Sequence, residues 1–195
     1  DSPVRYLIES GYLADPSFQA HHHEWADAEQ ASARVSNLLD ADPDLLRQVG
    51  EDGARNLLIR EALLDVTSRH ARTIYFAPSV ENSDAMAFLL RKNGIRAESV
   101  TGVTPKAERR EALKVFKELD SEPRVLCNYG ILTTGFDAPV TSAAVIARPT
   151  KSLVLYSQMV GRAMRGKLAG GNAACEIHTI VDTSLPGFSH PVSAF

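Results

Sequence analysis

From residue 71 to residue 183, short apolar runs rich in valine and isoleucine alternate with longer segments of helical periodicity. This alternation is typical of parallel sheets, in which each strand is followed by a crossover helix that packs on a face of the sheet. We therefore predict an α/β fold with a mostly parallel sheet and helices on both faces. The predicted strands are 73–77, 95–100, 124–127, 143–147 and 176–181.

Two of the intervening helices have clear predicted beginnings. Ser79 is suited to cap a helix that ends near Gly94, and Thr104 with Pro105 forms an N-cap followed by a first helical residue. In the second helix the apolar spacing predicts four buried side chains, which are Ala112, Leu113, Phe116 and Leu119.

The first 70 residues differ from the rest in charge and pattern. They contain 6 Lys and Arg against 13 Asp and Glu, a net charge of −7, whereas residues 71–195 contain 15 against 11, a net charge of +4. Periodicity predicts helices at 24–40 and 44–69, so residues 1–70 are expected to be a helical linker or accessory segment that begins irregularly over 1–24. Residues 184–195, rich in proline and glycine, are expected to form a loosely ordered tail.

Composition excludes several classes of protein. Of the 195 residues, 44% are hydrophobic and 23% charged, as in ordinary globular domains, and no apolar run is long enough for a membrane span. Cys127 and Cys175 lie in apolar contexts, so buried thiols fit better than a disulfide, and a reducing, cytoplasmic location is expected. His21-His22-His23 is interpreted as a solvated loop, because adjacent side chains rarely bind one metal ion.

Ligands of a parallel sheet bind beyond the carboxyl ends of its strands, which here means the loops 77–79, 99–104 and 128–140 and the approach to segment 151–166. Read as one helix, that segment has an apolar stripe made of Leu153, Tyr156, Val160 and Met164. The opposite side carries Gln158, Arg162 and Arg165, and Gly166 is expected as a left-handed C-cap. Two arginines on one side suit an anion, most naturally phosphate, although a surface helix with solvated arginines is the simpler alternative.

Four segments resemble superfamily 2 helicases, in the order in which that family has them. They are Thr73-Ile-Tyr-Phe-Ala-Pro78 (motif IV), Thr101-Gly102 with Glu108-Arg109-Arg110 (motif IVa), Ile131-Leu-Thr-Thr-Gly-Phe-Asp-Ala-Pro139 (motif V) and Gln158-x-x-Gly161-Arg162-x-x-Arg165 (motif VI). The resemblance covers residues 71–183 and implies the RecA-like, P-loop-NTPase-like second domain of such a motor. Asn56-Leu-Leu-Ile59 and Gly11-Tyr-Leu13 also resemble the segment before this domain in some bacterial members.

The subclass follows from details of the same motifs. DEAD-box RNA helicases usually have His-Arg before the Gly-Arg of motif VI, whereas this chain has Tyr156-Ser157-Gln158. Together with Arg148-Pro-Thr-x-Ser152 and the motif V sequence, this resembles the branch that includes motor subunits of type I and III restriction enzymes and related repair helicases. The resemblance therefore favours DNA as the nucleic acid.

The resemblance also implies roles for the matched residues. Arg162 and Arg165 correspond to arginine fingers that stabilise charge on the transferred phosphoryl group of ATP. Gly135, Asp137 and Gln158 correspond to nucleotide-binding positions: Asp137 accepts hydrogen bonds from the ribose, Gly135 allows close backbone approach, and Gln158 lies beside the arginines near the nucleotide. Contacts to the nucleic-acid backbone are expected from Ser79, Thr101, Gly102, Arg109, Thr133 and Thr134. Arg110 fits a contact and a solvated helix residue equally well. Taken alone, Asp137, Thr133 and Thr134 also fit an ordinary turn, and Gly102 and Gly135 also fit positions that need a positive φ.

Neither a G-x-x-x-x-G-K-[ST] loop nor an Asp-Glu dipeptide occurs in the chain. ATP and Mg²⁺ are therefore expected to bind a first RecA-like domain of the same protein, and no metal ion is expected to bind this chain alone. The expected partners are that domain and nucleic acid, with nuclease or methylase subunits as further candidates. The alternative is a RecA-like scaffold that binds nucleic acid or a partner without a motor. A Rossmann-type enzyme ranks last, because no glycine-rich loop follows the first predicted strand.

Overall fold

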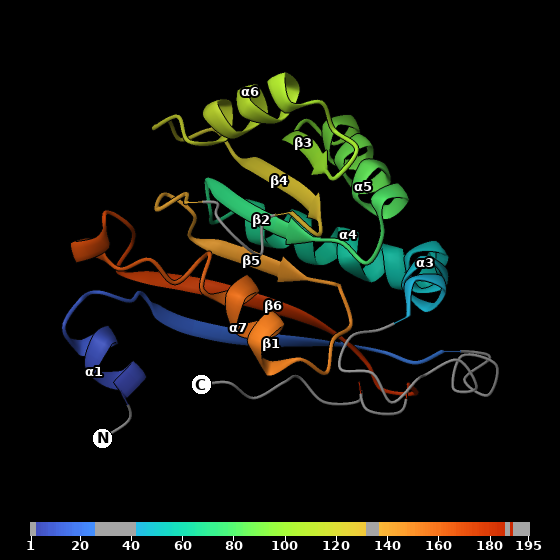
Figure 1. Ribbon diagram of the computed structural model, residues 1–195, viewed down its shortest axis with the longest axis horizontal. Helices are drawn as coiled ribbons and strands as arrows, with labels where there is room; N and C mark the ends of the chain where they lie inside the picture. Colours follow the sequence, from blue (N-terminus) through green and yellow to red (C-terminus); the bar gives the residue numbers. More distant parts are fainter. Residues whose placement is uncertain (1–2, 26–41, 132–136, 186–187, 189–195) are drawn as a thin grey trace.

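The computed structural model describes residues 3–25, 42–131, 137–185 and 188. A six-stranded, entirely parallel sheet forms its centre, in the order β1-β6-β5-β2-β4-β3 (Figure 1). The strands are β1 (Asp15–His23), β2 (Arg72–Phe76), β3 (Arg96–Thr101), β4 (Arg124–Tyr129), β5 (Ala143–Ile146) and β6 (Ala174–Asp182). The five strands predicted from apolar runs are thus confirmed, and β1 is an additional one.

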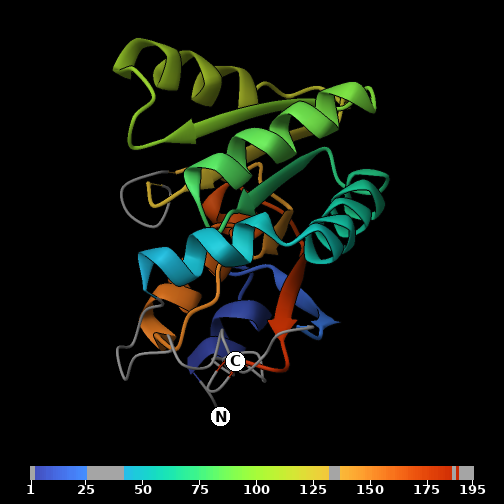
Figure 2. The same ribbon diagram turned by 90° about the vertical axis from the view of Figure 1, so that its right-hand side faces the viewer.

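Helices cover both faces of the sheet, as predicted. The helices are α1 (Pro3–Glu9), α3 (Pro43–Glu51), α4 (Gly53–Thr67), α5 (Val80–Lys92), α6 (Lys106–Phe116) and α7 (Leu153–Val160), with a 3₁₀ turn, η1, at Lys167–Ala169. On one face α4 and α5 bury Leu63 and Met86 against Tyr75 of β2, and on the other α6 and α7 bury Phe116 and Met159 against the sheet. Figure 2 shows α6 at one end of the molecule, beyond the edge strand β3.

Strand β1 corrects the expectation that residues 1–24 are irregular and that the three histidines form a loop. It pairs in parallel with β6 from Asp15↔Ala174 to His23↔Asp182. The ring nitrogens His21 Nε2 and His178 Nδ1 lie 2.9 Å apart across this pair. The segment lacks the β-branched residues typical of strands, so its conformation depends on the main-chain groups that the edge of β6 offers.

The predicted helix 44–69 is two helices that meet at Asp52. The carboxylate of Asp42 accepts from the N–H of Asp44 to begin α3, and that of Asp52 accepts from the N–H of Arg55 to begin α4. Because Asp52 has an extended backbone, α3 and α4 point in different directions. The predicted helix 24–40 lies almost entirely outside the described residues.

Two details of packing differ from what the sequence pattern suggests. Leu185 and Phe188 are buried against Leu45 and Val49 of α3, so the predicted tail begins as part of a core cluster. Leu119 is 89% exposed, because α6 ends at Phe116 and Leu119 lies in the irregular segment that follows it. None of the helices in the described ranges has the length and apolar character needed to cross a membrane.

Candidate nucleotide and nucleic-acid site

Helix α7 is shorter than predicted, and both candidate finger arginines lie beyond its end. The hydroxyl of Ser152 accepts from the N–H of Leu155 to begin the helix, which ends at Val160 with Gly161 as C-cap. Gly166 has an extended backbone with φ of −79° rather than a left-handed one. The prediction of one helix through residue 166 is therefore wrong: Arg162 lies in a turn and Arg165 in an extended segment.

The apolar stripe predicted for this segment is correct in three of its four members. Tyr156, Val160 and Met164 are buried in the core, whereas Leu153 is 50% exposed. Met159 is fully buried as well, so the buried face of α7 consists of Tyr156, Met159 and Val160.

The extended segment that carries Arg165 is held by main-chain hydrogen bonds on two sides. On one side, the N–H of Ala14 donates to the carbonyl of Met164, and the N–H of Gly166 donates to the carbonyl of Tyr12, each at 3.0 Å. On the other side, the N–H of Asn172 donates to the carbonyl of Arg165 at 2.8 Å. Residues 11–14 therefore position a candidate finger, a role that the sequence did not predict.

Glycine is required at residue 166 by this close approach. A Cβ added there would lie 2.3 Å from the carbonyl oxygen of Gly11, a main-chain atom that has no freedom to rotate away. The same holds at Gly171, where an added Cβ would lie 2.2 Å from the carbonyl oxygen of Arg165. The predicted C-cap glycine is thus a packing glycine.

The three charged residues of motifs V and VI come together. The Arg165 guanidinium lies 3.1 Å from the Asp137 carboxylate, with the two side chains 42% and 65% exposed. Partial burial, followed by the neighbouring positive charge of Arg165, lowers the pKa of Arg162, while the Asp137 carboxylate opposes that effect. A nearby anion stabilises the charged form of a guanidinium that is partly desolvated and lies beside another cation. The predicted nucleotide residue Gln158 lies on α7, half-buried.

The loop after β3 is tied together by Arg109, a predicted nucleic-acid contact. Its guanidinium donates to the carbonyls of Thr101 at 3.0 Å and Thr104 at 3.2 Å. The predicted cap is different as well, since Pro105 takes the N-cap position and the Thr104 hydroxyl accepts from the N–H of Thr101. Thr101 is buried and Gly102 is exposed at the carboxyl edge of the sheet. Arg109 therefore shapes this loop, and its contact with nucleic acid remains a prediction.

Ser79 is confirmed as the cap of α5, because its hydroxyl accepts from the N–H of Asn82 at 3.1 Å. It is only 7% exposed, beneath α3. A backbone contact from Ser79 stays a prediction, as do the roles assigned to Gly135, Thr133 and Thr134, which lie outside the described residues. Among the residues that are described, no cluster of His, Cys, Asp or Glu is arranged to hold a metal ion.

Sequence reasoning missed a buried ion pair near the carboxyl edge. The fully buried Arg55 donates to both carboxylate oxygens of Asp182, at 2.8 and 2.9 Å, and to the carbonyl of Ala147 at 2.7 Å. Trp25 Nε1 donates to the same carboxylate at 3.1 Å. Neighbouring residues in the sequence give no sign that Arg55 is buried. Only the fold shows that its hydrogen bonds join α4 to Asp182 of β6 and to Ala147, directly after β5.

Residues 55–167 match the family model described as "Helicase conserved C-terminal domain". The chain belongs to this family. It is the C-terminal, RecA-like lobe of a superfamily 2 helicase, near the restriction-subunit branch, which confirms the resemblance drawn from motifs IV to VI.

Individual relatives agree with this assignment. The chain is 33% identical over 137 residues to a "51.5 kDa protein" of a Lactococcus phage, covering 69% of this chain and 30% of the relative. It is 37% identical over 115 residues to "Putative ATP-dependent helicase IRC3" of Saccharomyces cerevisiae. This match covers 59% of this chain and 16% of the relative. A fragment structure of "a putative HsdR subunit of a type I restriction enzyme" from Vibrio vulnificus superposes on this chain with a TM-score of 0.64 and 26% sequence identity. The superposition covers 96% of this chain and 36% of the Vibrio chain. This helicase lobe thus spans about a third or less of the length of these relatives.

Proposed function

We propose that this chain is the second motor lobe of an ATP-dependent DNA helicase or translocase, and that Arg162 and Arg165 are its arginine fingers. The observation that carries the proposal is the meeting of Arg165 with Asp137, 3.1 Å apart, beside Arg162. These residues come from two motifs that are distant in sequence, and the fold brings them to one place. Two guanidiniums that share one carboxylate leave a net positive site, which suits a phosphate group.

The chemistry follows from where these charges lie. ATP with Mg²⁺, held by the first RecA-like domain, supplies the transferable phosphoryl group. Arg162 and Arg165 donate hydrogen bonds to oxygens whose negative charge increases in the transition state, an effect worth about 10³–10⁵ in rate. Asp137 accepts hydrogen bonds from the ribose, and Gln158 lies on the helix next to both arginines. The fingers thus make hydrolysis depend on closure of the two lobes.

The second part of the proposed mechanism is contact with the nucleic-acid backbone, which we assign to the exposed Gly102 and the buried Thr101. Both lie at the carboxyl edge, in the loop that Arg109 holds in place through main-chain carbonyls. Main-chain amides and hydroxyls at such an edge contact a nucleic-acid backbone without reading its sequence. Opening and closing of the lobes then moves these contacts along the strand. DNA is favoured over RNA because motif VI has Tyr156-Ser157-Gln158 where RNA helicases of the DEAD-box type usually have His-Arg.

The test is an ATPase assay on the intact protein with duplex DNA, single-stranded DNA and RNA at equal nucleotide concentrations. We expect ATP hydrolysis to be stimulated at least tenfold by DNA and less by RNA. Stimulation by RNA alone would overturn the preference for DNA. Turnover without any response to nucleic acid would overturn the motor and favour the scaffold alternative.

A further inference from the structure

Helix α6 carries a row of cations along its outer face, formed by Lys106, Arg110, Lys114 and Lys117. The spacings of four, four and three residues place them within an arc of about 80° on the helix surface. All four side chains are exposed, and Lys117, the C-cap, continues the helical backbone. We refer to these four residues as the α6 cation row.

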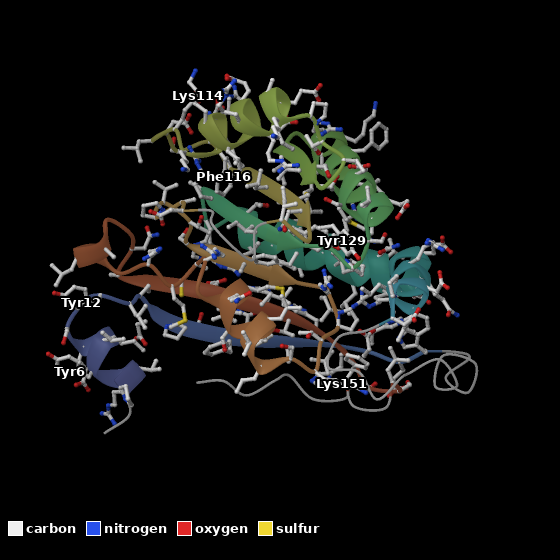
Figure 3. The ribbon with its side chains drawn as sticks, viewed as in Figure 1. Tyr6, Tyr12, Lys114, Phe116, Tyr129 and Lys151 are labelled. Atoms are coloured by element: carbon white, nitrogen blue, oxygen red, sulfur yellow. The ribbon has the colours of Figure 1, made fainter. Side chains whose placement is uncertain are left out.

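The fold makes the cation row face outward. Phe116 is 2% exposed and Ala112 and Leu113 are partly buried, so the opposite face of α6 packs on the sheet. Figure 3 shows Phe116 between α6 and the sheet, whereas Lys114 points away from the body of the molecule. Burial of one side therefore fixes the direction of the row.

Acidic residues that follow the row are used elsewhere. After Lys117, the carboxylates of Glu118 and Asp120 lie 3.0 and 2.9 Å from the guanidiniums of Arg124 and Arg72, which are buried at the base of β4 and β2. Glu122 lies 2.9 Å from Arg96. These three carboxylates are thus each paired with an arginine of β2, β3 or β4.

Within α6 itself, only Glu111 is close to the row. Its carboxylate lies 3.8 Å from Lys114 Nζ, with both side chains exposed, which gives a weak interaction. The other glutamate of the helix, Glu108, lies about 120° or more around the helix from each member of the row at 100° per residue. The outer face of α6 therefore keeps a positive charge.

The row continues the predicted nucleic-acid edge without a break. Lys106 begins α6 directly after the loop that contains Thr101 and Gly102, and Arg109 joins the two through its hydrogen bonds. An open groove of about 490 Å³ runs along the helix, and five of its six lining residues are basic: Lys106, Arg109, Arg110, Leu113, Lys114 and Lys117. The helix rises about 16 Å from Lys106 to Lys117, the length of about five phosphates of one strand.

We propose that the α6 cation row binds the phosphate backbone of the DNA that passes the Thr101–Gly102 loop. This inference rests on the proposed motor function and extends its nucleic-acid surface beyond the carboxyl edge, along the outside of the lobe. Because the phosphate backbone is the same at every base pair, phosphate contacts from the row strengthen binding to any sequence equally.

The experiment measures DNA binding by the intact protein as a function of salt concentration. The test variant replaces all four residues of the row with glutamine. The matched control removes four positive charges from other surfaces through Arg5→Gln, Arg47→Gln, Arg60→Gln and Lys92→Gln, on α1, α3, α4 and α5. Circular dichroism spectra and thermal unfolding of both variants verify that the fold is retained.

Each displaced counterion contributes about 0.9 to the slope of log K against log salt for duplex DNA. We expect the row variant to bind at least tenfold more weakly at physiological salt, with the magnitude of the slope reduced by about 3.6 for four lost phosphate contacts. The control should keep the wild-type slope. An unchanged slope in the row variant, or an equal loss in the control, overturns the inference. Failure of the proposed function is distinct, because the wild-type protein would then show neither DNA binding nor DNA-stimulated hydrolysis.

Discussion

The guanidinium of Arg165 and the carboxylate of Asp137 form a 3.1 Å ion pair between motif VI and motif V. Because the side chains are 42% and 65% exposed, a pair of this kind contributes only about 0–1 kcal/mol to folding. Its importance is positional, since it fixes where the proposed arginine finger lies relative to the predicted ribose contact. Variants here are therefore expected to separate turnover from stability.

Arg165→Ala in the intact protein should lower DNA-stimulated turnover by about 10³ or more and change the affinity for ATP only modestly, because the finger acts mainly on the transition state. Unfolding free energy should change by no more than about 1 kcal/mol. Steady-state ATPase kinetics and a nucleotide-binding titration measure both effects. Lys167→Ala, an exposed cation two residues away, is the control, and near-normal turnover of Arg165→Ala would remove the finger role.

Gly166→Ala tests whether residues 11–14 position Arg165. The new methyl group meets the carbonyl oxygen of Gly11 at 2.3 Å, so one of the two segments has to move. We expect a loss of about 1–3 kcal/mol in unfolding free energy, together with lower turnover. Urea denaturation and the ATPase assay measure the two effects. Gly53→Ala, where an added Cβ has no neighbour within 4 Å, should leave both unchanged; equal behaviour of the two variants contradicts the positioning role.

This chain alone should not hydrolyse ATP. It supplies arginines and a predicted ribose contact, while the sequence has no phosphate-binding loop and no Asp-Glu pair for Mg²⁺. The measurement is phosphate release by the purified 195-residue chain with saturating DNA, before and after addition of the separately produced first domain. Hydrolysis by the chain unaided would refute the division of labour between the lobes.

Arg55→Ala should destabilise the lobe by about 3–5 kcal/mol, because Asp182 would keep a buried charge without its bidentate partner. The combined change Arg55→Met and Asp182→Leu removes both charges and should cost less than Arg55→Ala. Chemical denaturation of the three proteins gives the comparison. If the double variant is less stable than Arg55→Ala, then the unpaired buried carboxylate of Asp182 is not the main cause of the destabilisation.

Glu176 predicts a pH-dependent contribution to stability. Its hydrogen bond with Arg69, at 2.9 Å, and then those with His178 and His70 lower the pKa of this carboxyl to about 2 despite partial burial. A group whose folded pKa is depressed stabilises the protein above its unfolded pKa, and the contribution is lost as pH falls from about 4.5 toward 2. Glu176→Gln should therefore cost about 1–3 kcal/mol at pH 7 and almost nothing near pH 2.

The measurement for Glu176 is the unfolding free energy of wild type and Glu176→Gln at a series of pH values. Glu61→Gln, an exposed carboxyl on α4, is the control and should show little difference at any pH. A difference between wild type and Glu176→Gln that stays constant with pH would show that the carboxylate charge is not the source of the effect.

Much of the fold follows from patterns between neighbouring residues. The alternation of apolar runs and helices predicted β2 to β6 and helices on both faces, and Ser79 predicted the start of α5. Motifs IV to VI, in order, predicted the family and the residues of the candidate site. These features depend on local hydrophobic periodicity, capping and turn chemistry, which a linear sequence displays directly.

Other features arise only when distant segments meet. Strand β1 forms because β6 offers it an edge. Gly166 packs closely on Gly11, and Arg109 donates to carbonyls of its own loop. The same is true of Arg55, whose buried partner is Asp182. Each of these outcomes depends on main-chain edges, steric contact or desolvated charge contributed by residues far away in the chain, and neither spacing nor composition records which segments those will be.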